Sequence, residues 1–225
     1  MRKKERKEMG KYSNKGLYAA YDKKNKERDK LDYYATPSGE VYNILNTLNI
    51  DFNCKTILEP AVGGGHMAEG IEEYLSEHQY KPTKTIGSDI KDRGYKNDAW
   101  ELNYNLDFMS DDYPYDSADW VIMNPPFSII EPFVIRSLEI AKEGVIMLGR
   151  LQFLEGEGRF EKIHSTNPPT DVYVYVDRIA CFKNGDFSLR PDSIQAYAWF
   201  VWDKRVEGRT PQLHFLRRLN KQNEK

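Results

Sequence analysis

The chain has 225 residues, is 40% hydrophobic and 30% charged, and carries a formal net charge of −2, which is ordinary for one soluble globular domain. No apolar run is long enough to cross a bilayer, and the first ten residues lack the apolar segment of a secretory signal, so we expect a cytoplasmic protein without a membrane segment. The two cysteines and four histidines have no metal-ligand spacing, so neither a metal site nor a disulfide framework is expected.

The two ends of the chain are expected to be basic arms outside the folded domain. Residues 1–30 contain twelve Lys or Arg against five Asp or Glu, with almost no apolar periodicity, and residues 203–225 contain seven against three. Basic arms are typical of proteins that contact a phosphate backbone, although a solvated tail without a partner has the same composition. We therefore expect a basic, disordered arm over 1–30, one domain over 31–205 and a basic tail over 206–225.

Apolar runs and helical patterns alternate along the centre of the chain. The helical patterns span residues 36–48, 65–75 and 131–144, and the runs typical of buried strands span residues 55–59, 84–90, 119–123 and 144–149. This alternation predicts an α/β domain with a mostly parallel sheet and helices on both of its faces.

The chain changes character after residue 150. Residues 150–170 mix glycine with charge and predict a loop with a short helix. Residues 171–182 and 196–204 are rich in β-branched and aromatic residues without a helical pattern between them. They predict antiparallel strands added to the edge of the sheet.

A glycine-rich turn follows the first strand of the alternation, in "ILEPAVGGGHMAEG" at 57–70. Gly63, Gly64 and Gly65 allow a tight turn and a close approach of the backbone to a ligand. Glu59 ends the strand, and a carboxylate there suits a cationic or amino-bearing ligand better than a pyrophosphate. A strand-to-helix turn without a ligand is the alternative interpretation.

Two further acidic residues follow the next apolar segments. Asp89 lies 24 residues after Gly65, about where a nucleotide-binding unit places the acid that receives ribose hydroxyls. Asp107 is placed to accept a hydrogen bond from an adenine amino group while Phe108 covers the ring. Capping or turn roles for the two acids, and a core role for Phe108, are the alternatives.

The run "DWVIMNPPFSII", residues 119–130, is the most specific feature of the sequence. Two prolines end a buried strand here, and they cannot continue a sheet ladder because neither has an N–H to donate. A simple turn would carry Gly, Asp or Ser at this place. A second "NPP" at 167–169 has Thr170 in the position of the aromatic residue, so we expect it to be only a turn.

These motifs together resemble those of S-adenosylmethionine-dependent amino methyltransferases, and most closely those of the N6-adenine DNA methyltransferases of phages and restriction systems. The resemblance extends from about Asp32 to Trp202. It implies a Rossmann-like class I methyltransferase fold, with a mostly parallel seven-stranded sheet, an antiparallel edge and helices on both faces. It also implies S-adenosylmethionine as the cofactor and DNA as the partner, while RNA is not excluded.

The resemblance assigns roles to individual residues. The cofactor-binding residues that it implies are Glu59, Pro60, Ala61, Gly63, Gly65, Asp89, Asp107 and Phe108, with Thr36 and Pro37 from "DYYATP". The catalytic turn that it implies is Asn124, Pro125, Pro126 and Phe127. An exocyclic adenine amine is a poor nucleophile. The Asn124 side-chain oxygen and the Pro125 carbonyl would accept hydrogen bonds from its two N–H groups. Phe127 would stack on the extruded base.

Several alternatives stay open at this point. The same chemistry would serve RNA adenine or a glutamine side chain of a protein, and a non-catalytic module could bind nucleic acid on a methyltransferase-like scaffold. Target recognition is expected from the 150–170 loop and the two basic arms, with Arg150, Arg159 and Phe153 as candidate contacts to phosphates and bases, although a solvated arginine is the commoner case. The sequence indicates no recognition site and no oligomeric state.

Overall fold

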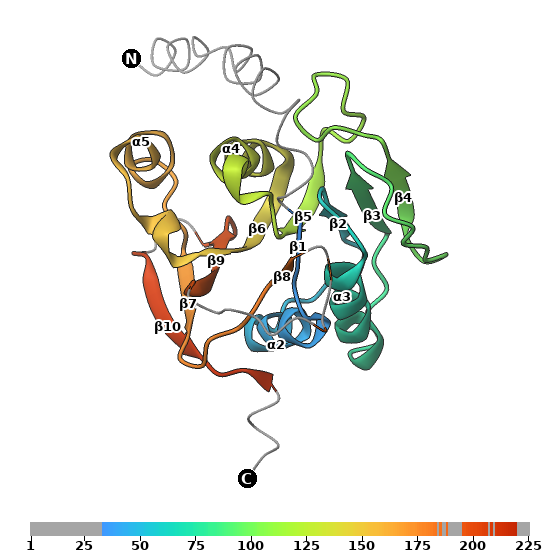
Figure 1. The fold of residues 1–225 in the computed structure, drawn as a ribbon, viewed down its shortest axis with the longest axis horizontal. Helices are drawn as coiled ribbons and strands as arrows, with labels where there is room; N and C mark the ends of the chain where they lie inside the picture. The colour runs from blue at the N-terminus through green and yellow to red at the C-terminus, as the bar shows by residue number, and fades with distance from the viewer. Residues whose placement is uncertain are drawn as a thin grey trace.

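The computed structural model describes residues 33–219, apart from 184, 186, 187, 189–194, 207 and 209, so the predicted arm over 1–30 lies outside the described residues. The described chain forms a mixed sheet of eight strands with helices on both faces (Figure 1). The strand order is β10-β7-β9-β6-β5-β2-β3-β4.

The predicted parallel part of the sheet is confirmed. Five neighbouring strands run parallel to one another, and they are β2 (Thr56–Glu59), β3 (Lys84–Asp89), β4 (Glu101–Tyr104), β5 (Ala118–Met123) and β6 (Ala141–Arg150). Beyond β6 lie three further strands, in the order β9 (Tyr197–Asp203), β7 (Asp171–Tyr175) and β10 (Gln212–Leu216). β9 is antiparallel to both of its neighbours, β6 and β7, whereas β10 is parallel to β7. The antiparallel edge therefore reduces to β9, because β7 and β10 run parallel to each other.

The eighth strand lies within the residues expected to form a basic tail. β10 pairs with β7 over five residues, so the sheet extends beyond residue 205. Its apolar side chains are largely uncovered, with Leu213 60% and Phe215 72% exposed. A strand without a strong burial pattern is hard to distinguish from a tail, because the alternation that predicts strands comes from one buried face.

The helices cover the sheet in two layers (Figure 1). On one face lie α2 (Ser38–Leu48) and α3 (His66–Glu77), and on the other lie α4 (Ile130–Ile140) and the short α5 (Glu157–Arg159) with its π-helical continuation Phe160–His164. Alternating strand residues serve the two cores: Trp120 and Ile122 pack with α2 and α3, whereas Val121 and Met123 pack with α4. None of the described helices has the length and apolarity that a bilayer span requires.

One predicted helix ends early. The helical pattern over 131–144 stops at Ile140, and β6 begins at Ala141 instead of residue 144. The ammonium group of Lys204 donates hydrogen bonds to the carbonyls of Leu138 and Ala141. Because the group that satisfies this helix end comes from a distant strand end, the pattern of 131–144 does not reveal where the helix stops.

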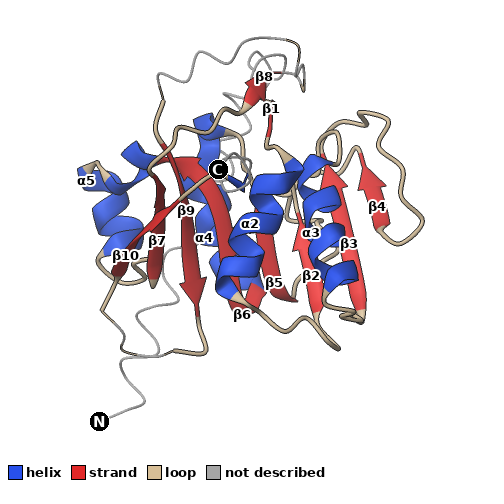
Figure 2. Cartoon of the chain, turned by 90° about the horizontal axis from the view of Figure 1, so that it is seen from below, coloured by secondary structure: helices blue, strands red, loops and turns tan. Residues whose placement is uncertain are grey.

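A second, two-stranded sheet was not predicted. β1 (Tyr34–Ala35) pairs antiparallel with β8 (Phe182–Lys183), with Tyr34 opposite Lys183 and Ala35 opposite Phe182. Figure 2 shows this pair above the carboxyl ends of the parallel strands. It therefore joins the start and the C-terminal part of the described chain over the edge where the predicted motifs lie.

Candidate functional site

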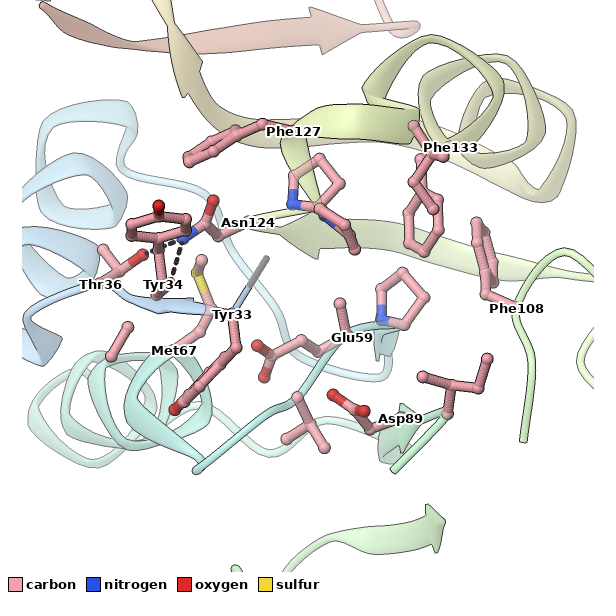
Figure 3. A pocket seen from close by; sticks show the side chains of 18 of the residues that line it. Tyr33, Tyr34, Thr36, Glu59, Met67, Asp89, Phe108, Asn124, Phe127 and Phe133 are labelled. Carbon is pink, nitrogen blue, oxygen red and sulfur yellow. Dashed lines mark hydrogen bonds between the residues drawn. The ribbon is translucent and has the colours of Figure 1, made fainter. Parts of the chain in front are cut away.

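A pocket opens at the carboxyl ends of β2, β3 and β5 (Figure 3). From β2 the chain builds the sheet outward through β3 and β4, and it then returns to place β5 on the other side of β2. Open α/β sheets bind ligands at such a switch point. Most of the predicted site residues line this pocket, namely Thr36, Glu59, Pro60, Ala61, Asp89, Asp107, Phe108, Asn124, Pro125, Pro126 and Phe127.

The other three predicted residues support the lining from outside it. Pro37 is the N-cap of α2, and its carbonyl accepts the N–H of Glu40. Gly63 and Gly65 both have positive φ, at 56° and 87°. A Cβ on Gly65 would lie 2.0 Å from the Tyr95 ring. Both the backbone conformation and the packing therefore require glycine in this turn.

Glu59 has the most unusual environment in the pocket. Its side chain is 1% exposed, and its Oε2 has no hydrogen-bond partner among the described residues. Burial, together with the negative charge of Asp89, raises the pKa of Glu59 well above its usual range. A buried oxygen without a partner is costly, so this carboxyl group is suited to receive a hydrogen-bond donor or a cation from a ligand.

Asp89 connects two turns beneath the pocket. Its Oδ2 accepts the N–H of Gly63 at 2.9 Å, and its Oδ1 accepts the N–H of Lys91 at 2.8 Å. The side chain thus fixes the glycine turn and also lines the pocket. The structural role and the ligand-binding role expected for this residue are therefore compatible.

Asp107 and Phe108 likewise combine a local role with a place in the lining. Asp107 Oδ1 accepts the N–H of Met109 at 2.8 Å, which is the turn role. Phe108 is 2% exposed and packs against Phe133, with ring centroids 4.8 Å apart. Both residues line the pocket, so the core and ligand interpretations of this pair do not exclude each other.

Tyr33 covers the glycine turn. Its hydroxyl accepts the N–H of Gly64 at 2.8 Å and lies 3.3 Å from His66 Nδ1, while the guanidinium of Arg93 lies 4.3 Å from its ring centroid. Burial raises the pKa of Tyr33, so the phenol stays protonated. His66 and Arg93 also line the pocket. Neither has a recognisable motif spacing, so they could not be predicted as lining residues.

The Asn124 amide has a defined orientation. Its Nδ2 donates hydrogen bonds to the Tyr34 carbonyl at 2.8 Å and to Thr36 Oγ1 at 3.0 Å. Its Oδ1 is buried and has no partner among the described residues. Figure 3 shows this oxygen on the side of the rings of Tyr34 and Phe127. Asn124 therefore presents an unused acceptor at the pocket.

Phe127 forms an aromatic wall beside that acceptor. It begins the 3-10 helix Phe127–Ile129, and its ring centroid lies 5.4 Å from that of Tyr34 and 5.9 Å from that of Tyr197. The guanidinium of Arg150 lies 4.5 Å from its ring centroid. Arg150, a candidate contact to nucleic acid, therefore packs on an aromatic ring, and the alternative of a simply solvated arginine does not describe it.

The segment over 150–170 is more ordered than a loop with one helix. It holds a 3-10 helix (Leu151–Leu154), α5 and a π-helix. Phe153 is 2% exposed and packs against Phe200 and Trp202, so its expected contact with nucleic acid is wrong. Arg159 donates a hydrogen bond to the Gln152 carbonyl at 2.6 Å. An aromatic residue in a glycine-rich, charged stretch gives no pattern from which burial can be predicted.

No protein-family model and no curated protein matches the sequence, whereas solved structures match its fold. A candidate class I S-adenosylmethionine-dependent methyltransferase from Listeria monocytogenes matches with a TM-score of 0.59 at 14% identity, over 90% of this chain and 72% of that chain. The type I restriction-modification methyltransferase subunit from Streptococcus thermophilus matches with a TM-score of 0.57 at 13% identity, over 83% of this chain and 47% of that one. A candidate RNA methyltransferase from Pyrococcus horikoshii matches with a TM-score of 0.53 at 18% identity, over 84% and 97% respectively.

These likenesses agree with the sheet order, the switch-point pocket and the helices on both faces. The sheet has eight strands where seven were expected, and the added strand, β10, lies at its edge. The chain has the Rossmann-like fold of class I S-adenosylmethionine-dependent methyltransferases.

Proposed function

We propose that this chain transfers a methyl group from S-adenosylmethionine to the exocyclic N6 amine of adenine in DNA. The observation that carries the proposal is the orientation of Asn124, whose Nδ2 is occupied by two acceptors and whose Oδ1 is buried without a partner beside the pocket. This atom needs a hydrogen-bond donor, and an amino group is one.

The residues of the pocket fit the cofactor. The unpartnered Glu59 carboxyl suits its ammonium group, Asp89 at the end of β3 suits its ribose hydroxyls, and Asp107 with Phe108 suits its adenine ring. The bound cofactor would supply an electrophilic methyl group on a sulfonium centre. Burial and the charge of Asp89 raise the pKa of Glu59, and an arriving ammonium group would act in the opposite direction by favouring the charged carboxylate.

Asn124 and Pro125 would activate the substrate amine. The lone pair of that amine is delocalised into the ring, and two acceptors on its N–H bonds draw the nitrogen toward a nucleophilic geometry. The Asn124 Oδ1 is one acceptor, and the Pro125 carbonyl, at a residue that cannot offer a competing N–H, is the other. Phe127 would stack on the extruded base. A neutral amide also avoids the cost of a second buried carboxylate near Glu59.

Adenine in DNA is proposed on the motif resemblance and on the basic character of residues 1–30 and 203–225. The fold likeness to a restriction-modification subunit agrees with this choice but does not decide it. RNA adenine is the second candidate, because the candidate RNA methyltransferase is covered over 97% of its length by this chain.

The test is the transfer of labelled methyl from S-adenosylmethionine to unmethylated plasmid DNA, RNA and bulk protein in parallel, followed by digestion to nucleosides or amino acids. We expect label in N6-methyl-2′-deoxyadenosine from DNA, which is lost in Asn124→Ala and retained in Asn167→Ala. Asn167 is a matched control because it begins the second "NPP" and is exposed. Label in RNA or protein alone would replace the substrate, and no label despite binding of S-adenosylmethionine would favour a non-catalytic module.

A further inference from the structure

A supporting contact lies behind the aromatic wall of the pocket. Phe127 lines the pocket, whereas Arg150 and Tyr197 are not among the described residues that line it. Arg150 nevertheless has its guanidinium 4.5 Å from the Phe127 ring centroid, and the Tyr197 ring centroid lies 5.9 Å from it. Phe127 is thus in contact both with the pocket and with these two side chains outside its lining.

The position of Arg150 follows from the sheet. Arg150 is the last residue of β6 and lies directly opposite Tyr197 of β9 in the antiparallel register. Directly opposed residues of an antiparallel pair project from the same face, here toward the core of α2 and α3 against which Phe127 also packs. The strand pair therefore holds Arg150 near the Phe127 ring without a flexible loop.

Tyr197 fixes the guanidinium in turn. Burial raises the pKa of Tyr197, and the positive charge of Arg150 acts in the opposite direction, which places the two side chains in electrostatic contact. The Cys181 thiol, next to β8, is hydrogen-bonded to the same phenol. Arg150 is thus held between a buried phenol and an aromatic ring.

We propose that Arg150 is a positioning residue, which holds the Phe127 ring against the pocket through a cation–π contact on the ring's outer face. The inference rests on the proposed function, in which Phe127 stacks on the extruded adenine. A cation behind the ring polarises its π electrons away from the pocket, so the inner face attracts a second cation less. The ring is thereby suited to a neutral base rather than to the sulfonium of the cofactor.

The variants that test this role are Arg150→Met, which keeps the apolar length, and Arg150→Lys, which keeps the cation. Arg205→Met is the matched control, since Arg205 makes the same kind of contact with Trp120 at 5.0 Å, away from the pocket lining. We expect Arg150→Met to lower kcat/KM for unmethylated plasmid DNA by about tenfold, with the dissociation constant of S-adenosylmethionine changed by no more than roughly twofold. Arg150→Lys should recover part of the loss.

A second readout needs no activity. With 4-fluorophenylalanine at position 127, the fluorine resonance should shift and change its line width in Arg150→Met but not in Arg205→Met. An unchanged resonance, an equal loss of kcat/KM in the Arg205 control, or Arg150→Lys no better than Arg150→Met would overturn the proposal. If the wild-type protein methylates no nucleic acid, the proposed function fails, and the fluorine resonance alone decides whether Arg150 positions Phe127.

Discussion

The two copies of "NPP" in this chain have different surroundings, and the difference separates the proposed catalytic turn from a turn that serves packing. At 124–126 the asparagine is tied by its Nδ2 to Tyr34 and Thr36, and its Oδ1 is buried without a partner among the described residues. At 167–169 the asparagine side chain is exposed, and its backbone carbonyl accepts the Trp202 indole N–H at 2.9 Å. The first copy leaves a buried acceptor unused, whereas the second contributes to packing. The identical tripeptide sequences do not predict this difference.

The largest effect should come from removing the unused acceptor. Asn124→Ala should lower the rate of methyl transfer by roughly 10²–10³-fold, because a positioned polar group at the reacting centre is lost. Asn167→Ala should leave the rate unchanged. Single-turnover measurement with labelled S-adenosylmethionine checks both, and equal losses in the two variants would end the distinction between the copies.

The second effect concerns Glu59, which shares with Asn124 an unpartnered buried oxygen. Glu59→Gln should weaken the binding of S-adenosylmethionine by about tenfold or more, because the charge-assisted bond to an ammonium group is lost. Calorimetry measures this change. Binding of equal affinity in wild type and variant would assign another role to this carboxyl group.

The same residue predicts a dependence of stability on pH. The pKa of Glu59 is raised in the folded state, so in the window between its ordinary value and its folded value the folded protein holds more protons than the unfolded one. Without cofactor, the free energy of unfolding of the wild type should therefore fall as pH rises through this window, and Glu59→Gln should lack this component. Urea unfolding from about pH 5 to about pH 9 checks the sign, and a wild type that gains stability relative to the variant with rising pH would contradict it.

A smaller effect should follow when the Asn124 side-chain amide loses one of the two hydrogen bonds that orient it. Thr36→Val removes one of the two acceptors that orient Asn124 Nδ2 and keeps the side-chain shape. We expect a loss of about tenfold in kcat, because the amide then samples both orientations. Steady-state kinetics with plasmid DNA give the value, and a change confined to KM would refute the orienting role.

The smallest effect belongs to the second copy. Trp202→Phe removes the hydrogen bond to the Asn167 carbonyl, and it should lower the free energy of unfolding by about 1 kcal/mol while kcat/KM stays constant. Thermal unfolding and kinetics on the same preparation separate the two quantities. A loss of activity without a loss of stability would show that the second copy also serves the reaction.

The sequence predicted those parts of the fold that leave a local pattern. The strands of the parallel sheet appeared as apolar runs, and the motifs at their ends converge on one pocket because the carboxyl ends of parallel strands share an edge. Asn124 and Glu59 were selected by residue type at a strand end. Whether their side-chain oxygens have partners depends on neighbours that are distant in the sequence. No local sequence pattern predicts those neighbours.

The features missed are those that arise from tertiary contacts. β1 and β8 are two residues each and exist through their pairing, and α4 ends where Lys204 from beyond β9 meets its last carbonyls. Phe153 is buried by Phe200 and Trp202, although its own segment reads as a polar loop. In each case the decisive partner lies at least 40 residues away in the sequence.

The small sheet of β1 and β8 has a consequence for the order in which the protein matures during synthesis. The Tyr34 carbonyl that orients Asn124 belongs to β1, and β1 is paired with Phe182–Lys183. The glycine turn, the acidic residues and the "NPPF" turn all leave the ribosome before Phe182 and Lys183 are made. A nascent chain that already contains the glycine turn, the acids and the "NPPF" turn therefore still lacks β8, the strand that pairs with the β1 segment whose carbonyl orients Asn124. The proposed methyl transfer should therefore begin only once this C-terminal segment has joined the site.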